Sequence, residues 1–234
     1  MRARRAFGPG LDVAILVDDS AAVGATAAEG GGVDRPLASV DDMATHVATA
    51  LEQRGHRARI LALPPDVPAL FAFMASLEAD VIQNHVECYG DQAALESAVR
   101  GMMELTGIPV TGAPLEGLAL CLDKPRTRRV LLGEGVPVPR AIVVADPEGS
   151  LDGVPLPCIV KPAAQDASEG IDGTSVCHSL PEARARVAQL LAAGLGPALV
   201  EGFVDGRELN VSMLEMPGGE LRVLPVAEID FLRL

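Results

Sequence analysis

Aromatic residues are scarce in this sequence, with no Trp, one Tyr and five Phe among 234 residues. A core must therefore be built from aliphatic side chains, and the 49% hydrophobic content is too high for a disordered chain. Positive charge is also scarce, because 32 acidic residues outnumber 19 basic ones and give a net charge of −13. This balance argues against a nucleic-acid binder, which normally presents excess positive charge. It leaves open a phosphate site, which needs only a few local donors.

Lysine is rarer still. Only Lys124 and Lys161 are lysines, and the other 17 basic residues are arginines. A GC-rich coding bias toward Arg explains the imbalance most simply. Under that bias a remaining Lys deserves inspection, because a compact ammonium and a planar guanidinium are not interchangeable. Both lysines are followed by Pro and lie in the middle of the chain.

Several motif classes are absent. The four cysteines form no CxxC pair or Cys/His cluster, which argues against zinc and favours reduced thiols in a cytoplasmic protein. No GxxxxGK[ST] loop and no GxSxG elbow occur. No run of 18 apolar residues occurs, so we expect no membrane-spanning segment. Residues 1–10 are basic and Gly-rich at their end, and we expect them to form a disordered extension.

The first half of the chain alternates between strand-like and helix-like patterns. Helix 40–55 is expected to follow an N-cap at Ser39 and a Gly- and Ala-rich loop. The other expected elements are strand 12–17, strand 57–63, helix 67–78, strand 80–83, helix 91–106 and strand 108–111. The order βαβαβαβ predicts an α/β domain with a parallel sheet over residues 11–113.

The pattern changes to α+β after residue 113. Expected helices are 114–122, 125–134 and 181–194, and expected strands are 140–145, 156–162, 174–178, 198–204, 208–214 and 221–230. Pro217-Gly218-Gly219 indicates a hairpin turn between the last two strands. We therefore predict a second domain over residues 114–234 with antiparallel pairing.

The polar residues of this second half suggest a nucleotide site. Lys161 ends an apolar strand beside a flexible turn, where it can lie over a phosphate, with donors from Ser168 and Gly170. Glu201 is a carboxylate inside an apolar strand that could border an adenine, and Glu208 is placed to hold a ribose diol. Taken singly, each of these charged residues is more simply explained as a solvated charge at a strand end.

Five short motifs, in order and at suitable spacing, carry a family resemblance. They are DK at 123–124, VKP at 160–162, SEGI at 168–171, VEGFVDGREL at 200–209 and PVAEI at 225–229. Together they resemble the ATP-grasp superfamily, and most closely its D-alanine–D-alanine ligase branch. The stretch 84–114 is similar to the region that leads into the DK helix in that branch. The first 80 residues match only in topology.

The resemblance implies ATP-binding roles for residues at the matching positions. Lys124 and Lys161 would contact the phosphates beneath a loop at 164–171 that includes Ser168 and Gly170. Glu201 would lie next to the adenine, which Phe203 and Val204 would flank, and Glu208 would bind the ribose. No catalytic residue is assigned with certainty.

The implied reaction is an ATP-dependent carboxylate–amine ligation through an acyl phosphate, with amino acids as substrates, ATP and Mg²⁺ as cofactors, and a role in cell-wall biogenesis. A homodimer is an open alternative. The family's magnesium ligands are expected beyond Leu234, so the ATP-grasp domain is predicted to be incomplete at the C-terminus. Asp18-Asp19-Ser20 replaces the family's first glycine-rich turn, which puts D-alanine itself in doubt. The alternatives are an inactive ATP-binding homologue or regulatory module, and a ligase for other amino acids.

Overall fold

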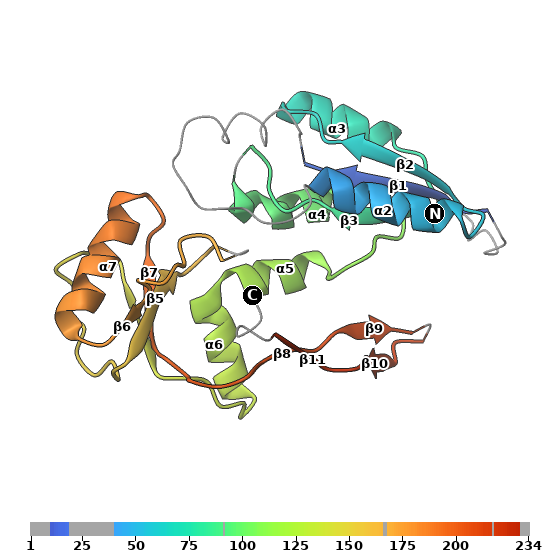
Figure 1. Ribbon diagram of the computed structural model, residues 1–234. Coiled ribbons are helices and arrows are strands. Elements are labelled where there is room, and N and C mark those ends of the chain that lie inside the picture. Colours follow the sequence, from blue (N-terminus) through green and yellow to red (C-terminus); the bar gives the residue numbers. More distant parts are fainter. Residues whose placement is uncertain (1–9, 19–39, 91, 166–167, 217, 230–234) are drawn as a thin grey trace.

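The computed structural model describes residues 10–18, 40–90, 92–165, 168–216 and 218–229 (Figure 1). Most of the expected extension at 1–10, the loop at 20–36 and the predicted N-cap at Ser39 lie outside these residues. No helix in the described ranges is long and apolar enough to cross a membrane.

A three-stranded parallel sheet organises the first part of the chain. Its strands are β1 (Asp12–Val17), β2 (Arg57–Ala62) and β3 (Val81–His85), in the order β2-β1-β3. β1 is central and both of its faces are buried, which explains its uninterrupted apolar sequence. Its alternate residues enter two different cores, one on each face of the sheet.

Helices cover both faces of this sheet. Helix α2 (Val40–Glu52) packs on one face, where Ala44 is fully buried. On the other face, α3 (Val67–Ser76) and α4 (Glu96–Leu105) contribute Leu70, Met74, Val99 and Met103 to the larger core. A short 3₁₀ helix, η2 (Ala93–Leu95), precedes α4. The expected strand at 108–111 is reduced to one parallel bridge, between Val110 and Ile82.

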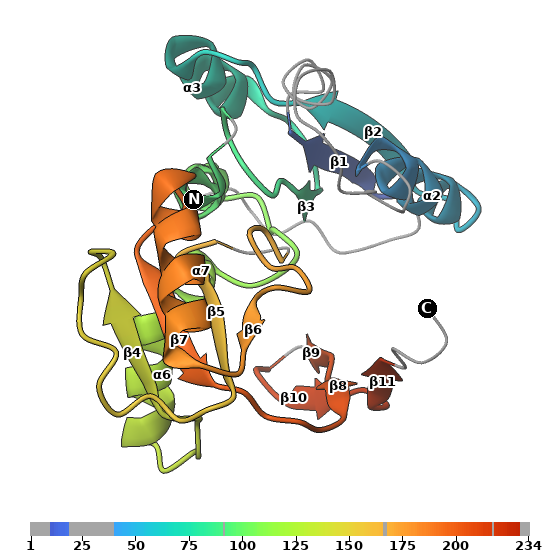
Figure 2. The same ribbon diagram turned by 60° about the vertical axis from the view of Figure 1, so that its left-hand side comes forward.

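A second, antiparallel sheet follows two further helices. Helix α5 (Leu115–Leu122) leads into α6 (Lys124–Gly133), whose N-cap Asp123 accepts a hydrogen bond from the Arg126 backbone N–H at 2.9 Å. The sheet contains β4 (Ala141–Val144), β5 (Cys158–Pro162), β6 (Val176–Cys177) and β7 (Ala198–Gly202), in the order β4-β7-β5-β6. Helix α7 (Leu180–Ala192) packs against it (Figure 2).

The last part of the chain forms two short antiparallel pairs. Strand β8 (Glu208–Asn210) pairs with β11 (Ala227–Ile229), and β9 (Met213–Glu215) pairs with β10 (Leu221–Val223). The hairpin predicted around Gly218 is therefore confirmed. The two long strands predicted at 208–214 and 221–230 are wrong in extent, because each is interrupted. Their apolar side chains are exposed, including Leu209, Met213 and Val223.

Candidate functional site

Two of the predicted site residues, Lys161 and Glu201, lie on one face of the second sheet. Val160 on β5 pairs with Val200 on β7, and both are fully buried in the core that α7 covers. Lys161 pairs with Leu199, and Glu201 lies two residues further along β7. Because side chains alternate across a strand, Lys161 and Glu201 share the opposite face and lie diagonal to each other.

Glu201 is bound by two cations at once. Its Oε1 is 2.7 Å from Lys161 Nζ, and its Oε2 is 2.6 Å from Arg128 Nη1. The side chains of Glu201, Lys161 and Arg128 are only 12%, 21% and 14% exposed. The alternative that Lys161 and Glu201 are solvated charges is therefore wrong. Arg128 was not among the predicted residues, and its second Nη donates to the carbonyl of Pro139.

Lys124 lies close to the same strand end. Its backbone N–H donates to Ala163 O at 3.1 Å, which fixes the start of α6 against the residue that follows β5. Its ammonium donates to the carbonyl of Gln165, in the predicted phosphate loop. Lys124 and Arg128 are four residues apart on α6 and so share one side of the helix. The two predicted lysines thus converge on the end of β5.

The described part of the predicted loop contains a tight turn. Ile171 N donates to Ser168 O at 3.0 Å, and Gly170 has a φ of +67°. Ser168 itself has a φ of +61°, a left-handed conformation that is costly outside glycine. A Cβ at Gly170 would lie 2.9 Å from Pro162 Cγ, so only glycine fits without movement.

Arg186 on α7 holds this loop from the core side, and sequence reasoning missed it. It is 9% exposed, and its Nη2 donates to Gly170 O at 2.9 Å and to Ser175 Oγ at 3.1 Å. The same nitrogen is 3.0 Å from Asp172 Oδ2. A signal was available, because Arg186 interrupts the apolar stripe formed by Ala183, Val187 and Leu190.

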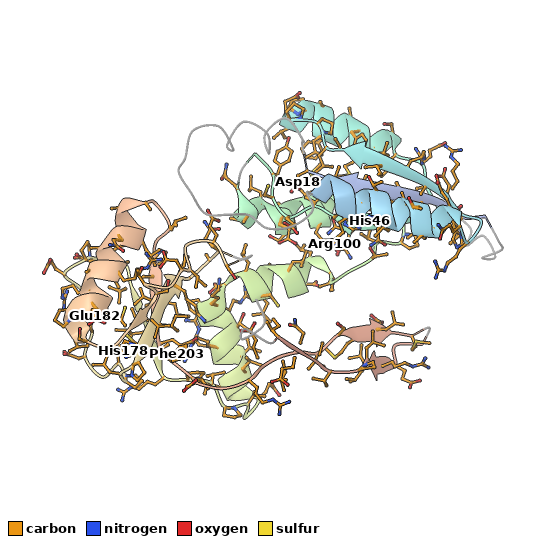
Figure 3. The ribbon with its side chains drawn as sticks, viewed as in Figure 1. Asp18, His46, Arg100, His178, Glu182 and Phe203 are labelled. Carbon is orange, nitrogen blue, oxygen red and sulfur yellow. The ribbon has the colours of Figure 1, made fainter. Side chains whose placement is uncertain are left out.

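The remaining predicted residues are more exposed. Phe203 and Val204 follow β7 and are 38% and 67% exposed (Figure 3 labels Phe203). Glu208 lies on β8, outside the four-stranded sheet. Within the described residues, no hydrogen bond or ion pair joins Glu208 to Lys161 or Glu201. The adenine and ribose assignments therefore stay predictions.

Asp18 lies at the carboxyl end of β1, in the first part of the molecule (Figure 3). Its Oδ1 accepts backbone hydrogen bonds from Glu87 at 3.1 Å and Cys88 at 3.3 Å. Burial raises the pKa of the Asp18 carboxyl above its ordinary value, although these hydrogen bonds oppose the shift. Asp18 thus fixes the start of the segment after β3, where the family resemblance begins.

The residues that the structure describes offer no metal site of their own. Among them, no group of three or more His, Cys, Asp or Glu side chains could hold a metal ion. The groups around Glu201 are the cations of Lys161 and Arg128, and they do not fit Mg²⁺, which prefers several oxygen ligands. No described residue is therefore assigned to that ion.

Comparison with known proteins gives sequence relatives that are named D-alanine–D-alanine ligase. A D-alanine–D-alanine ligase from Gluconobacter oxydans is 30% identical over 182 residues, covering 77% of this chain and 57% of the relative. A ligase of the same name from Bordetella avium is 37% identical over 138 residues, covering 57% of this chain and 42% of the relative. The chain therefore spans 57% of the length of the first relative and 42% of the second. No family model matches it.

Solved structures give the same fold. The D-alanine–D-alanine ligase of Bacillus anthracis complexed with ATP superposes with a TM-score of 0.67 at 16% identity, covering 94% of this chain and 66% of that one. The VanG D-Ala:D-Ser ligase of Enterococcus faecalis gives a TM-score of 0.63 at 18% identity, covering 94% and 70%.

The parallel-sheet unit, the antiparallel sheet and their order match the fold of these solved structures, which confirms the predicted fold class of an α/β unit followed by an α+β unit. In sequence and in fold, the chain is similar to D-alanine–D-alanine ligases. The predicted domain boundary near residue 113 stays a prediction.

Proposed function

We propose that this chain carries the ATP-binding part of an ATP-dependent carboxylate–amine ligase that acts through an acyl phosphate. The observation that carries the proposal is the convergence of Lys124 and Lys161 on the end of β5, beside the mostly buried Glu201. Positive side chains that gather at one strand end suit a polyphosphate, because it carries several negative charges. The sequence relatives support the proposal because they share the name of a ligase.

In this proposal the protein positions ATP and neutralises its charge. Lys124 and Lys161 bind the phosphates, and the turn at Ser168 and Gly170 covers them. Glu201 lies beside the adenine, which Phe203 and Val204 flank, and Glu208 binds the ribose. The γ-phosphate is transferred to a substrate carboxylate, and an amine then displaces phosphate to form an amide. Positioning and electrostatic stabilisation supply most of the rate enhancement in such transfers.

ATP binding tests the first half of this proposal. Replacing Lys161 by Met removes one charge-assisted contact to the phosphates and should weaken ATP binding at least about tenfold. Arg54→Met removes a charge of the same sign from an exposed position after α2 and serves as the matched control. Calorimetric titration with ATP and MgCl₂ measures both variants. Equal affinity in wild type and Lys161→Met would contradict the assignment of Lys161.

The acceptor amine needs a separate test. One structural relative is named as a D-Ala:D-Ser ligase, so an acceptor other than D-alanine is worth including. Phosphate release by the complete natural protein should be measured with ATP, MgCl₂ and a panel of D- and L-amino acids. We expect release to depend on an amino acid. Release that is equal with and without every member of the panel would refute an amino-acid ligase.

A further inference from the structure

Arg128 touches the site but belongs to none of the motifs that predicted it. We propose that Arg128 is a positioning residue of the nucleotide site, which holds Glu201 so that Lys161 can move to the phosphates. This inference rests on the proposed function. It assigns a role to the contact between Arg128 and Glu201, which the proposed ATP-binding residues alone do not explain.

The two cations on Glu201 differ in how firmly they are held. The Arg128 guanidinium donates to Glu201 Oε2 through one nitrogen and to Pro139 O through another. Pro139 lies just before β4, and Ala141 on that strand pairs with Glu201 itself. Arg128 thus joins β7 to the segment that leads into the neighbouring strand β4, through a rigid fork. Lys161 offers a flexible stem and makes one contact to Glu201.

This difference decides which cation moves when a polyphosphate arrives. Lys161 can leave Glu201 only if the mostly buried carboxylate keeps another counter-charge, because an unpaired buried charge is strongly unfavourable. Arg128 supplies that charge from a fixed position. Without Arg128, Lys161 becomes the sole partner of Glu201 in this cluster and is retained by it. Phosphate binding then has to compete with the ion pair.

Suppression by a second substitution tests this mechanism. The probe is inorganic triphosphate, which has no base, so that any contact of Glu201 with adenine does not enter the measurement. Arg128→Met should weaken triphosphate binding about tenfold, the scale of one charge-assisted hydrogen bond. Adding Glu201→Gln removes the competitor of Lys161, and the double variant should return to within about threefold of wild type.

The same set of variants includes controls for net charge and for folding. The double variant has the same formal charge as wild type. Arg129→Met removes one positive charge from an exposed neighbour on α6, and should change binding less than about threefold because exposed charges are screened. Arg128→Lys keeps the charge but not the fork, and we expect an intermediate affinity. Thermal unfolding without ligand reports whether each variant is folded, and if Arg128→Met is not, the lysine and double variants decide.

Three results would overturn the inference. Equal affinities for Arg128→Met and Arg129→Met would show that Arg128 contributes only its charge. A double variant that binds as weakly as Arg128→Met would show damage unrelated to Glu201. In both cases ATP binding by wild type would leave the proposed function intact. Failure of the wild-type chain to bind either ATP or triphosphate would instead overturn the proposed function together with this inference.

Discussion

Replacing Gly170 by alanine should destabilise the second sheet unit by about 2–5 kcal/mol. The left-handed backbone, at a φ of +67°, costs a residue with a Cβ about 1–2 kcal/mol. The new Cβ would also lie 2.9 Å from Pro162 Cγ, 3.0 Å from Leu195 Cδ1 and 3.2 Å from Leu190 Cδ2. These atoms belong to a packed region, and overpacking of that kind costs about 1–3 kcal/mol.

Gly194 provides the matched control for this substitution. It has a φ of +76° at the end of α7, but a Cβ there would meet no atom within 4 Å. Gly194→Ala should therefore cost only the backbone contribution, about 1–2 kcal/mol. The difference between the two variants isolates the packing around Gly170. It should lower Tm for Gly170→Ala by at least about 2 °C more than for Gly194→Ala.

Circular dichroism is the appropriate probe, because the chain has no Trp and its single Tyr, Tyr89, lies in the first unit. Urea titration at fixed temperature should accompany the thermal scans, since two units need not unfold together. If Gly170→Ala is no more destabilising than Gly194→Ala, the loop is not packed as the structure shows.

Three further predictions concern the lysines, the thiols and the final strands. Lys124→Arg and Lys161→Arg should each lower kcat/KM of the complete natural protein at least about tenfold, a loss of about 1.4 kcal/mol, and unchanged rates would make the rarity of Lys a compositional accident. Alkylation by iodoacetamide at pH 8 should modify the exposed Cys121 first and spare Cys158, because burial raises the pKa of the Cys158 thiol to about 11 and keeps it protonated. Mass spectrometry measures the two alkylation rates, and equal rates in the folded protein would contradict this prediction. Amides of residues 208–229 should exchange faster than those of β5 and β7, since these short pairs are exposed, and equal protection would show that the final strands are covered.

Sequence patterns predicted the fold well where apolar runs and helical periodicity were clear. The βα alternation of the first unit follows from apolar runs such as that of β1, which can only be buried on both faces. The predicted strand at 108–111 is only a bridge, and the strands after residue 207 are interrupted. In both cases the pairing depends on neighbours distant in sequence, which a local pattern does not specify.

Part of the candidate site was predictable because two of its residues are of a type that is rare in this chain. Lys124 and Lys161 stand out in a chain that otherwise uses arginine. Arg128 and Arg186 are two among 17 arginines, and nothing in their frequency separates them from surface residues. Their contacts to Glu201 and Gly170 join α6 to β7 and α7 to the loop, across gaps of sequence that no local motif spans.

The pairing of β5 with β7 constrains how this site can be altered. Side chains alternate between the two faces of each strand, so Val160 and Val200 point into the core while Lys161 and Glu201 point away from it. Inserting or deleting a single residue within either strand would exchange the two faces of that strand, placing its charged residue against α7 and its valine on the site face. The side chains on this face can therefore be exchanged in place, while changes in length are tolerable only in the connecting loops.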